Sequence, residues 1–268
     1  MTLKYFFWHN SDLAELNQET GFDLYSMGHL IWLVAIAAAT WYFSGIYKKQ
    51  DSIRRKQIKR FFAIFLLAIE VLKDIYLCLT GNFSAEYLPF HLCSIAIFVI
   101  LIDAFIEKQQ ISRQLIAYAF MPGAVSALLF CNWTEYPFLN YMNIHSFIFH
   151  GWIVCYMVMI YRGKELGPIY KGIWQTALFI GVTAPPLFLF NSIFGTNFMF
   201  LNVASEGSPL VPLWNLFGEE YGYPGYLTAY AILAVAVFHV LWLFYFLMEK
   251  GLAKGEKDEK KTRNMFVP

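Results

Sequence analysis

Charged residues are scarce in this sequence. Asp, Glu, Lys and Arg make up 15% of its 268 residues, whereas soluble domains contain roughly 25%. Hydrophobic residues reach 58% and aromatic residues 19%, and the mean hydropathy is +0.48. Too few charges are present to cover the surface of a water-soluble domain of this length. The composition therefore argues against a soluble protein and indicates one that is embedded in a membrane.

Cysteines are also few. The four of them, Cys78, Cys93, Cys131 and Cys155, show no CxxC spacing, which argues against a zinc site or a redox motif. Cys78 and Cys131 are both expected near outer helix ends, where they could form a disulfide or remain free. The histidines lack the paired spacing of a helical metal site, so we predict neither a metal nor a cofactor.

Seven segments are long and apolar enough to cross about 30 Å of hydrocarbon at about 1.5 Å per residue. Lipid cannot satisfy backbone amides, so each segment must be a helix and the predicted fold class is all-α. The segments are Leu24–Ile46, Phe61–Thr80, Leu88–Ile106, Gln114–Cys131, Asn140–Tyr161, Gly172–Phe194 and Gly225–Met248. We expect one seven-helix transmembrane domain over residues 1–248 and a charged tail over residues 249–268.

Basic residues are distributed unevenly between the loops. The loops 47–60, 107–113 and 161–172 and the tail carry seven, two, three and six of the 20 Lys and Arg residues. All four regions fall on one side of an alternating seven-span map, and basic loops are retained in the cytoplasm. This predicts an N-terminus outside, a C-terminus in the cytoplasm and a multi-pass membrane protein. The net charge of +1 conceals the asymmetry and gives no reason to invoke nucleic acid.

One outer connection is much longer than the others. Residues 195–224 are rich in glycine, proline and aromatic residues, a composition that suits a lid or a re-entrant cap on the outer face. In the sixth span, Pro185 and Pro186 are expected to break or kink the helix near its middle. Pro122, which precedes Gly123, is expected to do the same in the fourth span.

Ionisable residues inside the spans need an explanation, because each costs roughly 2.5–3.5 kcal/mol on insertion scales. In the second span, Glu70, Lys73 and Asp74 lie on one face of the helix. They are either an internally neutralised group that keeps helices in register or the polar wall of a substrate cavity.

A cysteine and several histidines form a second group of candidates. Cys93 lies in the first two turns of the third span, in the run LPFHLCSI, and is either a packing residue or a thiol activated by the helix N-terminus. His91 lies about 200° around the helix from Cys93, and in the fifth span His145 and His150 lie about 140° apart. A cysteine with a nearby histidine is the minimum for covalent acyl transfer, because the imidazole takes the thiol proton and the thiolate attacks an ester. Spacing does not choose between the two histidines of the fifth span.

The runs LPFHLCSI, HGW and FNSIFGTNFMFLN followed by SPL resemble the YwaF-like bacterial membrane proteins, which are related to eukaryotic transmembrane protein 164. The resemblance extends from the second span to the seventh. It implies an acyltransferase-like enzyme that acts on phospholipid acyl chains through a Cys–His pair. A more distant kinship links it to membrane hydrolases of fatty-acid esters of hydroxy fatty acids. Carried over by motif, the nucleophile is Cys93, the histidine is His150, and the family's asparagines correspond to Asn191 and Asn197.

Three functions are therefore considered. The first is an enzyme that transfers or hydrolyses an acyl group of a membrane lipid in the outer leaflet, through an acyl-Cys93 intermediate with His150 as base. Its expected substrate-binding residues are His91, His145, Glu70, Lys73, Asn191 and Asn197. The second is a binding or transport protein for a small polar or lipid solute. The third is a structural protein whose polar residues only join helices.

Overall fold

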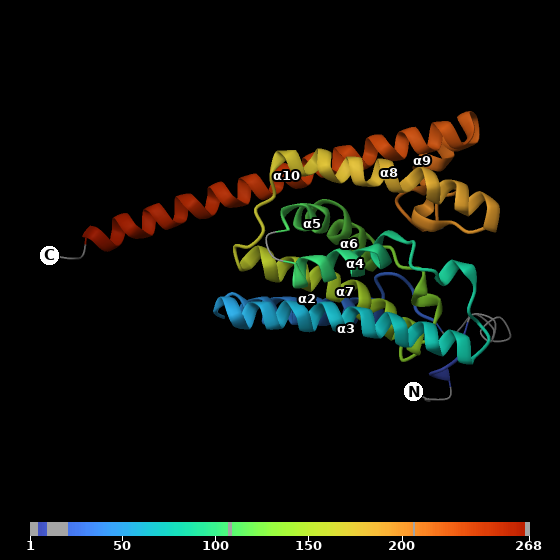
Figure 1. The fold of residues 1–268 in the computed structure, drawn as a ribbon, viewed down its shortest axis with the longest axis horizontal. Coiled ribbons are helices and arrows are strands. Elements are labelled where there is room, and N and C mark those ends of the chain that lie inside the picture. Colours follow the sequence, from blue (N-terminus) through green and yellow to red (C-terminus); the bar gives the residue numbers. More distant parts are fainter. Residues whose placement is uncertain (1–4, 10–20, 107–108, 206, 266–268) are drawn as a thin grey trace.

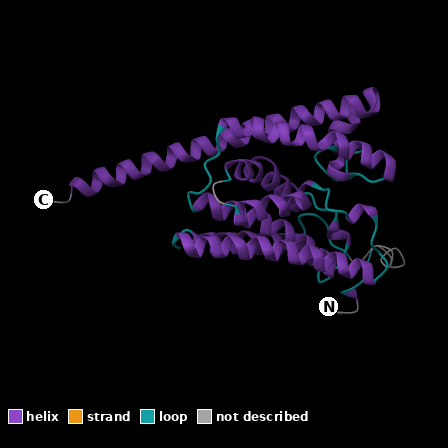
Figure 2. Cartoon of the chain, in the orientation of Figure 1, coloured by secondary structure: helices purple, strands orange, loops and turns teal. Residues whose placement is uncertain are grey.

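The structure is a computed structural model that describes residues 5–9, 21–106, 109–205 and 207–265, with side chains up to residue 251. Within these ranges every regular element is a helix, as Figure 2 shows. The long helices lie side by side, and the last of them projects beyond the others toward the C-terminus (Figure 1). The all-α prediction is confirmed.

Among the described residues, six helical stretches are long and apolar enough to cross a membrane. Three are single helices: α2 (Met27–Tyr47), α7 (Tyr141–Arg162) and α8 (Tyr170–Phe194). The other three stretches combine shorter elements. These are η2 (Ala85–Tyr87) with α4 (Leu92–Phe105); α5 (Gln110–Leu115), η3 (Ile116–Phe120), α6 (Met121–Leu129) and η4 (Trp133–Glu135); and α9 (Val211–Leu213), η6 (Trp214–Gly218) and α10 (Glu219–Met265).

The remaining long helix, α3 (Ser52–Leu79), packs against α4 and α7. It differs from the six stretches because its apolar half carries Glu70, Lys73 and Asp74. Six to seven spans agree with the predicted seven. Which side of the membrane each terminus occupies remains a prediction.

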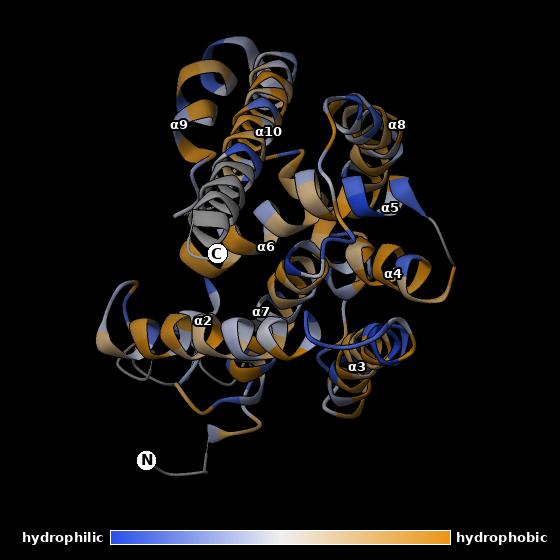
Figure 3. Ribbon diagram, turned by 90° about the vertical axis from the view of Figure 1, so that its left-hand side faces the viewer, coloured by the Kyte–Doolittle hydropathy of each residue, from blue (hydrophilic) through white to orange (hydrophobic). Residues whose placement is uncertain are grey.

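The centre of the bundle is α7, which contacts α2, α3, α4 and α6. Figure 3 views the bundle along its length and shows α7 between these helices, with α8 and α10 on the side away from α2 and α3. The approach of α2 depends on Gly151, because a Cβ there would lie 3.0 Å from side-chain carbons of Ile36. A glycine next to His150 thus allows close helix packing, as in other membrane bundles.

The two ends of the bundle differ in character. At one end, called the basic end here, α2, α4 and α7 finish and α3, α5 and α8 begin. Arg55 donates to the carbonyl of Gly163 at 2.8 Å, and Arg113 donates to the carbonyl of Glu165 at 2.6 Å. The described basic loops therefore meet in space. At the opposite, loop-rich end, α3 finishes and α4 and α7 begin.

Pro122 distorts the fourth span in a defined way. A π-helical turn, η3, immediately precedes α6, in which Pro122 is the second residue. Proline has no N–H for the carbonyl four residues earlier, and a π turn re-pairs the backbone around such a gap. The distortion predicted at Pro122 is therefore a π-helical turn just before that residue.

Pro185 and Pro186 do not interrupt α8, so a break there is wrong, whereas the alternative of a kink stays a prediction. The helix is continuous from Tyr170 to Phe194. Two residues before Pro185, the Thr183 hydroxyl donates to the Phe179 carbonyl at 2.9 Å. Proline keeps a helical φ, so a helix can continue through it where the backbone tolerates the missing bonds.

The long connection and the tail are both more regular than expected. The 195–224 segment contains η5 (Phe198–Phe200), α9 and η6, and η6 packs back against α10. The chain changes direction at Gly222, whose φ of 63° lies in the left-handed region that glycine adopts readily. Beyond Met248, α10 continues as a helix to Met265, so the described part of the predicted tail is helical.

Candidate functional site

A buried chain of charges joins α3 to α7 in the half of the bundle nearer the loop-rich end. Lys73 Nζ donates to Glu70 Oε1 at 2.7 Å and lies 3.3 Å from Asp74 Oδ1. The other Glu70 oxygen, Oε2, lies 3.4 Å from His145 Nε2. Glu70, Lys73 and His145 are each less than 9% exposed. Sequence spacing predicted the pairing within α3, and the structure extends it to the fifth span.

His91 begins α4 rather than belonging to it. It is the N-cap residue, with an extended backbone and no hydrogen bond from its side chain to the helix. The angle of about 200° assumed that His91 is helical, so it does not describe the true placement. The imidazole ring lies 5.0 Å from the Phe198 ring and 5.8 Å from the Phe200 ring. His91 therefore faces the loop that follows α8.

Cys93 is the second residue of α4 and is half-buried against the hydrophobic core. Its sulfur interacts electrostatically with Glu70 of α3 and with Tyr230 of α10. No hydrogen bond joins Cys93 to another side chain in the described part of the chain. The thiol thus lies in the same neighbourhood as the charge chain.

His150 has a defined tautomer. Its Nδ1 lies 2.7 Å from the Ser146 carbonyl oxygen. A carbonyl only accepts hydrogen bonds, so Nδ1 carries the proton and Nε2 of the neutral ring keeps a lone pair. The ring stacks on Trp133 with 4.8 Å between centroids and an interplanar angle of 11°, which fixes its plane. His150 interacts electrostatically with His145, Glu70 and His91, so these residues form one cluster.

The contacts of the ring nitrogens therefore differ between the two histidines of α7. His145 directs Nε2 at a carboxylate, whereas His150 is held through Nδ1 by a carbonyl. Of these two rings, only that of His150 has an Nε2 without a contact to a described carboxylate.

Another cysteine contacts a histidine directly, and sequence analysis did not identify this pair. Cys131 Sγ lies 3.6 Å from His29 Nε2 in the buried contact of α2 with the end of α6. The His29 ring accepts at Nδ1 from the Tyr25 amide (2.9 Å) and donates from Nε2 to the Leu128 carbonyl (2.8 Å). Both nitrogens are occupied, so His29 cannot take a proton from Cys131. Cys131 is buried and unpaired and Cys78 is exposed and unpaired, so no disulfide joins them.

The loop after α8 is organised by the two asparagines named above. The Asn191 side chain is 1% exposed, donates to the Phe198 carbonyl at 3.0 Å, and accepts from Phe198 N and Thr196 Oγ1, both at 2.9 Å. Asn197 donates to the Val203 carbonyl at 2.9 Å. Their amides are used within the loop, so they position it.

The same loop contains two residues in the left-handed region. Met199 and Phe200 each have a φ of 55°, a conformation that costs roughly 1–2 kcal/mol for a residue other than glycine. Two tyrosines of α10 hold these residues: Tyr226 donates to the Phe200 carbonyl at 2.8 Å and Tyr230 to the Met199 carbonyl at 3.4 Å. The 195–203 loop is thus clamped between α10 and His91. Nothing in the sequence distinguished these tyrosines from ordinary interfacial aromatics.

The site contains no evident metal centre. In the ranges that the structure covers, no three His, Cys, Asp or Glu side chains come together to hold an ion. The described side chains of the site supply a thiol, imidazole rings and a charge pair.

Comparison with known proteins gives one match. No curated protein and no solved structure matches the chain. The model of the TMEM164 family matches residues 24–246, a range that includes α2 to α8, the 195–203 loop and the described cluster. Because this match covers most of the sequence, the chain belongs to the TMEM164 family.

Proposed function

We propose that this protein is a membrane-embedded enzyme that transfers or hydrolyses an acyl group of a membrane lipid, with Cys93 as nucleophile and His150 as general base. The observation that carries the proposal is the state of His150, whose Nδ1 is fixed by a carbonyl and whose Nε2 is available. The half-buried Cys93 thiol at the start of α4 interacts electrostatically with Glu70, which interacts in turn with His150; among the described residues no interaction joins Cys93 to His150 directly. These are the two groups that covalent acyl transfer needs.

The reaction has two steps. In the first, His150 Nε2 takes the Cys93 thiol proton while the sulfur attacks the ester carbonyl carbon. The tetrahedral intermediate collapses, the C–O bond breaks, and the leaving alcohol receives the proton from His150. In the second step, water or another alcohol attacks the acyl-Cys93 thioester with His150 again as base. A carboxylic acid or a new ester leaves and the thiol is restored.

The charge chain supports these steps in the proposal. The Glu70 carboxylate interacts with both Cys93 and His150. It would stabilise the imidazolium that forms when His150 takes the proton, and it would oppose a free thiolate at Cys93, so the proton transfer accompanies the attack of the sulfur. Lys73 balances the Glu70 charge before the reaction, and Lys73 and His145 supply donors for the lipid's polar oxygens. His91 lines the same region, below the 195–203 loop.

The 195–203 loop acts as the cover of the site in this proposal. Asn191 and Asn197 hold its shape through the hydrogen bonds described above, so their contribution to substrate binding is indirect. A direct hydrogen bond between Cys93 and His150 is expected to form when a lipid enters the site, because catalytic hydrogen bonds often tighten in the complex with substrate. With basic loops inside, the chemistry would take place in the outer leaflet of a bacterial cytoplasmic membrane.

The test is acyl labelling of the purified protein by a phospholipid that carries an alkyne on one acyl chain. The wild type is expected to acquire a label that hydroxylamine removes, as a thioester requires. Cys93→Ala should remove the label. Cys78→Ala is the matched control, because Cys78 is an exposed thiol at the same end of the bundle.

His150→Gln is expected to slow labelling about 10²- to 10⁴-fold, the usual range for loss of a general base. His239→Gln is its control, because His239 Nδ1 makes the same bond to the carbonyl four residues earlier, at 2.8 Å. Labelling that persists in folded Cys93→Ala would refute the proposal. Lipid-dependent thermal stabilisation without any labelling would instead favour the alternative, a binding or transport protein without catalysis.

A further inference from the structure

His150 needs a stabilising group for the positive charge that it acquires in the proposed reaction. When Nε2 takes the thiol proton of Cys93, the ring becomes an imidazolium that carries a proton on both nitrogens. Its Nδ1–H donates to the Ser146 carbonyl, which bears only a partial negative charge. In a Ser–His–Asp triad, a carboxylate accepts from that nitrogen and supplies a full charge. In the part of the chain that the structure describes, no hydrogen bond or ion pair joins a carboxylate to His150.

The Glu70 carboxylate reaches the His150 ring only through space. Its Oε1 accepts from Lys73 at 2.7 Å, and its Oε2 lies 3.4 Å from His145 Nε2. Both carboxylate oxygens therefore have contacts of their own, and their effect on His150 is electrostatic. A group in direct contact with the ring would add to this stabilisation.

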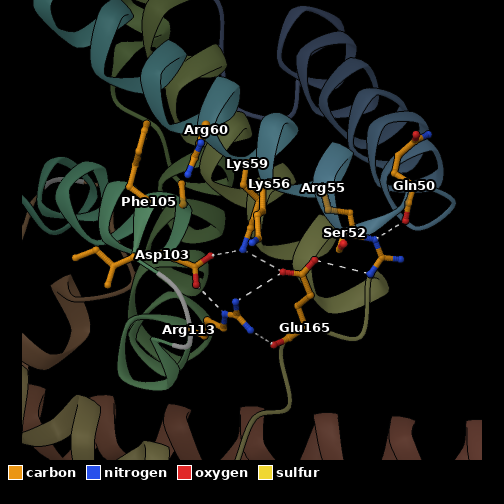
Figure 4. A pocket seen from close by; sticks show the side chains of 12 residues that line it. Gln50, Ser52, Arg55, Lys56, Lys59, Arg60, Asp103, Phe105, Arg113 and Glu165 are labelled. Carbon is orange, nitrogen blue, oxygen red and sulfur yellow. Dashed lines mark hydrogen bonds and ion pairs between the residues drawn. The ribbon is translucent and has the colours of Figure 1, made fainter.

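Charges elsewhere in the bundle have partners in direct contact. At the basic end, Figure 4 shows Lys59 and Arg113 between the carboxylates of Asp103 and Glu165. Arg113 Nε lies 2.7 Å from Asp103 Oδ1, and Lys59 Nζ lies 3.1 Å from Glu165 Oε2. Burying a cation without such a partner is costly. The protonated ring of His150 therefore requires a partner of another kind.

The indole of Trp133 lies in the place of such a partner. Trp133 begins η4, and its ring stacks on the His150 ring with 4.8 Å between centroids and 11° between planes. A cation over the face of an aromatic ring, within about 6 Å of its centroid, is attracted by the negative charge of that face, and tryptophan attracts it most. Phe149 also meets the His150 ring, edge to face at 5.4 Å. Aromatic surroundings of this kind weaken screening by water and strengthen the attraction.

Packing, and not a hydrogen bond, sets the position of this indole. The Trp133 Nε1–H is buried and has no hydrogen-bond partner among the described residues. The ring meets Phe147 edge to face at 5.6 Å, and the carbonyl of the next residue, Thr134, accepts from the Phe22 amide at 2.9 Å. A Cβ on Gly21 would lie 2.5 Å from the same carbonyl oxygen, so glycine permits this approach. A buried donor without a partner is unfavourable, so the ring face explains the presence of tryptophan better than its N–H does.

We propose that Trp133 is a positioning residue that stabilises the imidazolium of His150 through the face of its indole. The inference rests on the proposed function, because the imidazolium arises when His150 takes the proton of Cys93. The indole serves His150 as the carboxylate serves the histidine of a triad. It does so without placing a further negative charge near the thiol, where such a charge would oppose loss of the proton.

The first test measures the imidazolium in the purified full-length protein in detergent micelles. Deuterium exchange at C2 of a histidine ring proceeds from the imidazolium, so its rate at pH 6 follows the imidazolium population. Fragment mass spectra separate His150 from His145. Trp133→Leu should slow exchange at His150 about 5- to 30-fold, as expected for loss of a half-buried cation–π contact. Trp152→Leu is the matched control and should leave that rate unchanged, because Trp152 lies on the same helix and stacks on Phe62 at 4.2 Å.

Fluorinated tryptophans separate charge stabilisation from packing. Fluorine withdraws electrons from the indole face and changes its shape little, so the attraction to the imidazolium falls with each fluorine added. Protein produced with mono-, di- and trifluorotryptophan should therefore show progressively slower exchange at His150. All eight tryptophans are replaced in this way, so Trp133→Phe protein prepared identically is the control and should show no trend. A thermal melt verifies that each protein is folded, and exchange that does not change with the number of fluorines would refute the inference.

The acyl-labelling rate of the same proteins distinguishes this inference from the proposed function. If both hold, labelling and exchange slow together as fluorines are added. Labelling that requires Cys93 and His150 but does not change with the number of fluorines would refute the inference and leave the proposed function intact. A fluorine trend in exchange without any labelling would support the indole contact and refute the enzyme.

Discussion

Asp103 is fully buried at the basic end, and its replacement by asparagine measures what holds that end together. Its carboxylate lies 2.7 Å from Arg113 Nε, accepts from the Tyr156 hydroxyl at 2.7 Å and lies 3.6 Å from Lys59 Nζ. The contacts join α3, α4, α5 and α7 through one side chain. The Asp103→Asn substitution keeps nearly the same side-chain shape and removes the charge.

The expected loss follows from what the substitution leaves behind. Removing one partner of a buried ion pair costs about 3–5 kcal/mol, because the other charge stays buried without compensation. Here Lys59 and Arg113 are only 7% and 14% exposed, so neither can reach water without rearrangement. Glu165 still contacts both of them. The low end of the range, about 3 kcal/mol, is therefore expected for Asp103→Asn.

The assay is reversible unfolding in mixed micelles, followed by circular dichroism at increasing mole fractions of dodecyl sulfate. Asp74→Asn is the control, since Asp74 is 34% exposed and its pair with Lys73 should contribute less than about 1 kcal/mol. Lys59→Met should cost less in the Asp103→Asn background than in the wild type, because the two residues interact. Equal free energies of unfolding for the Asp103→Asn and Asp74→Asn variants would refute the reasoning.

Three further substitutions test the packing and the loop. Gly151→Leu should lower the thermal midpoint of the protein because α2 lies against that position, and Ile36→Ala should restore part of the loss. Asn191→Ala should cost about 1–3 kcal/mol by leaving buried loop groups without partners, measured by the same unfolding assay. Tyr226→Phe removes one hydrogen bond to the 195–203 loop and should speed proteolysis of that loop several-fold. The free energy of unfolding should stay within about 1 kcal/mol of the wild-type value.

The spans could be predicted because their signal is local. Hydropathy and length decide whether a segment crosses a membrane, and neither depends on the partners of that segment. The Glu70–Lys73 pair was predictable for the same reason, since residues three apart on a helix are neighbours. The course of α8 through Pro185 and Pro186 was not predictable, because it depends on how the backbone absorbs the lost bonds.

The contacts between helices could not be predicted from the sequence. The approach of Glu70 to His145 and of His29 to Cys131 depends on the rotation and depth of two helices, and periodicity fixes neither. Sequence spacing also could not choose between His145 and His150. The contacts of their ring nitrogens differ, and that information exists only in the folded chain.

The proposed Cys93 site and the charge network around Asp103 lie near opposite ends of one helix. Cys93 and Asp103 are ten residues apart on α4, which corresponds to about 15 Å along its axis. That distance is about half the hydrocarbon thickness, so a lipid whose head group lies at the Cys93 site cannot also place it at the charge network. Asp103→Asn should therefore lower the amount of folded protein without changing the acyl-labelling rate per folded molecule. A large change in that rate would mean that α4 couples the charge network around Asp103 to the Cys93 cluster.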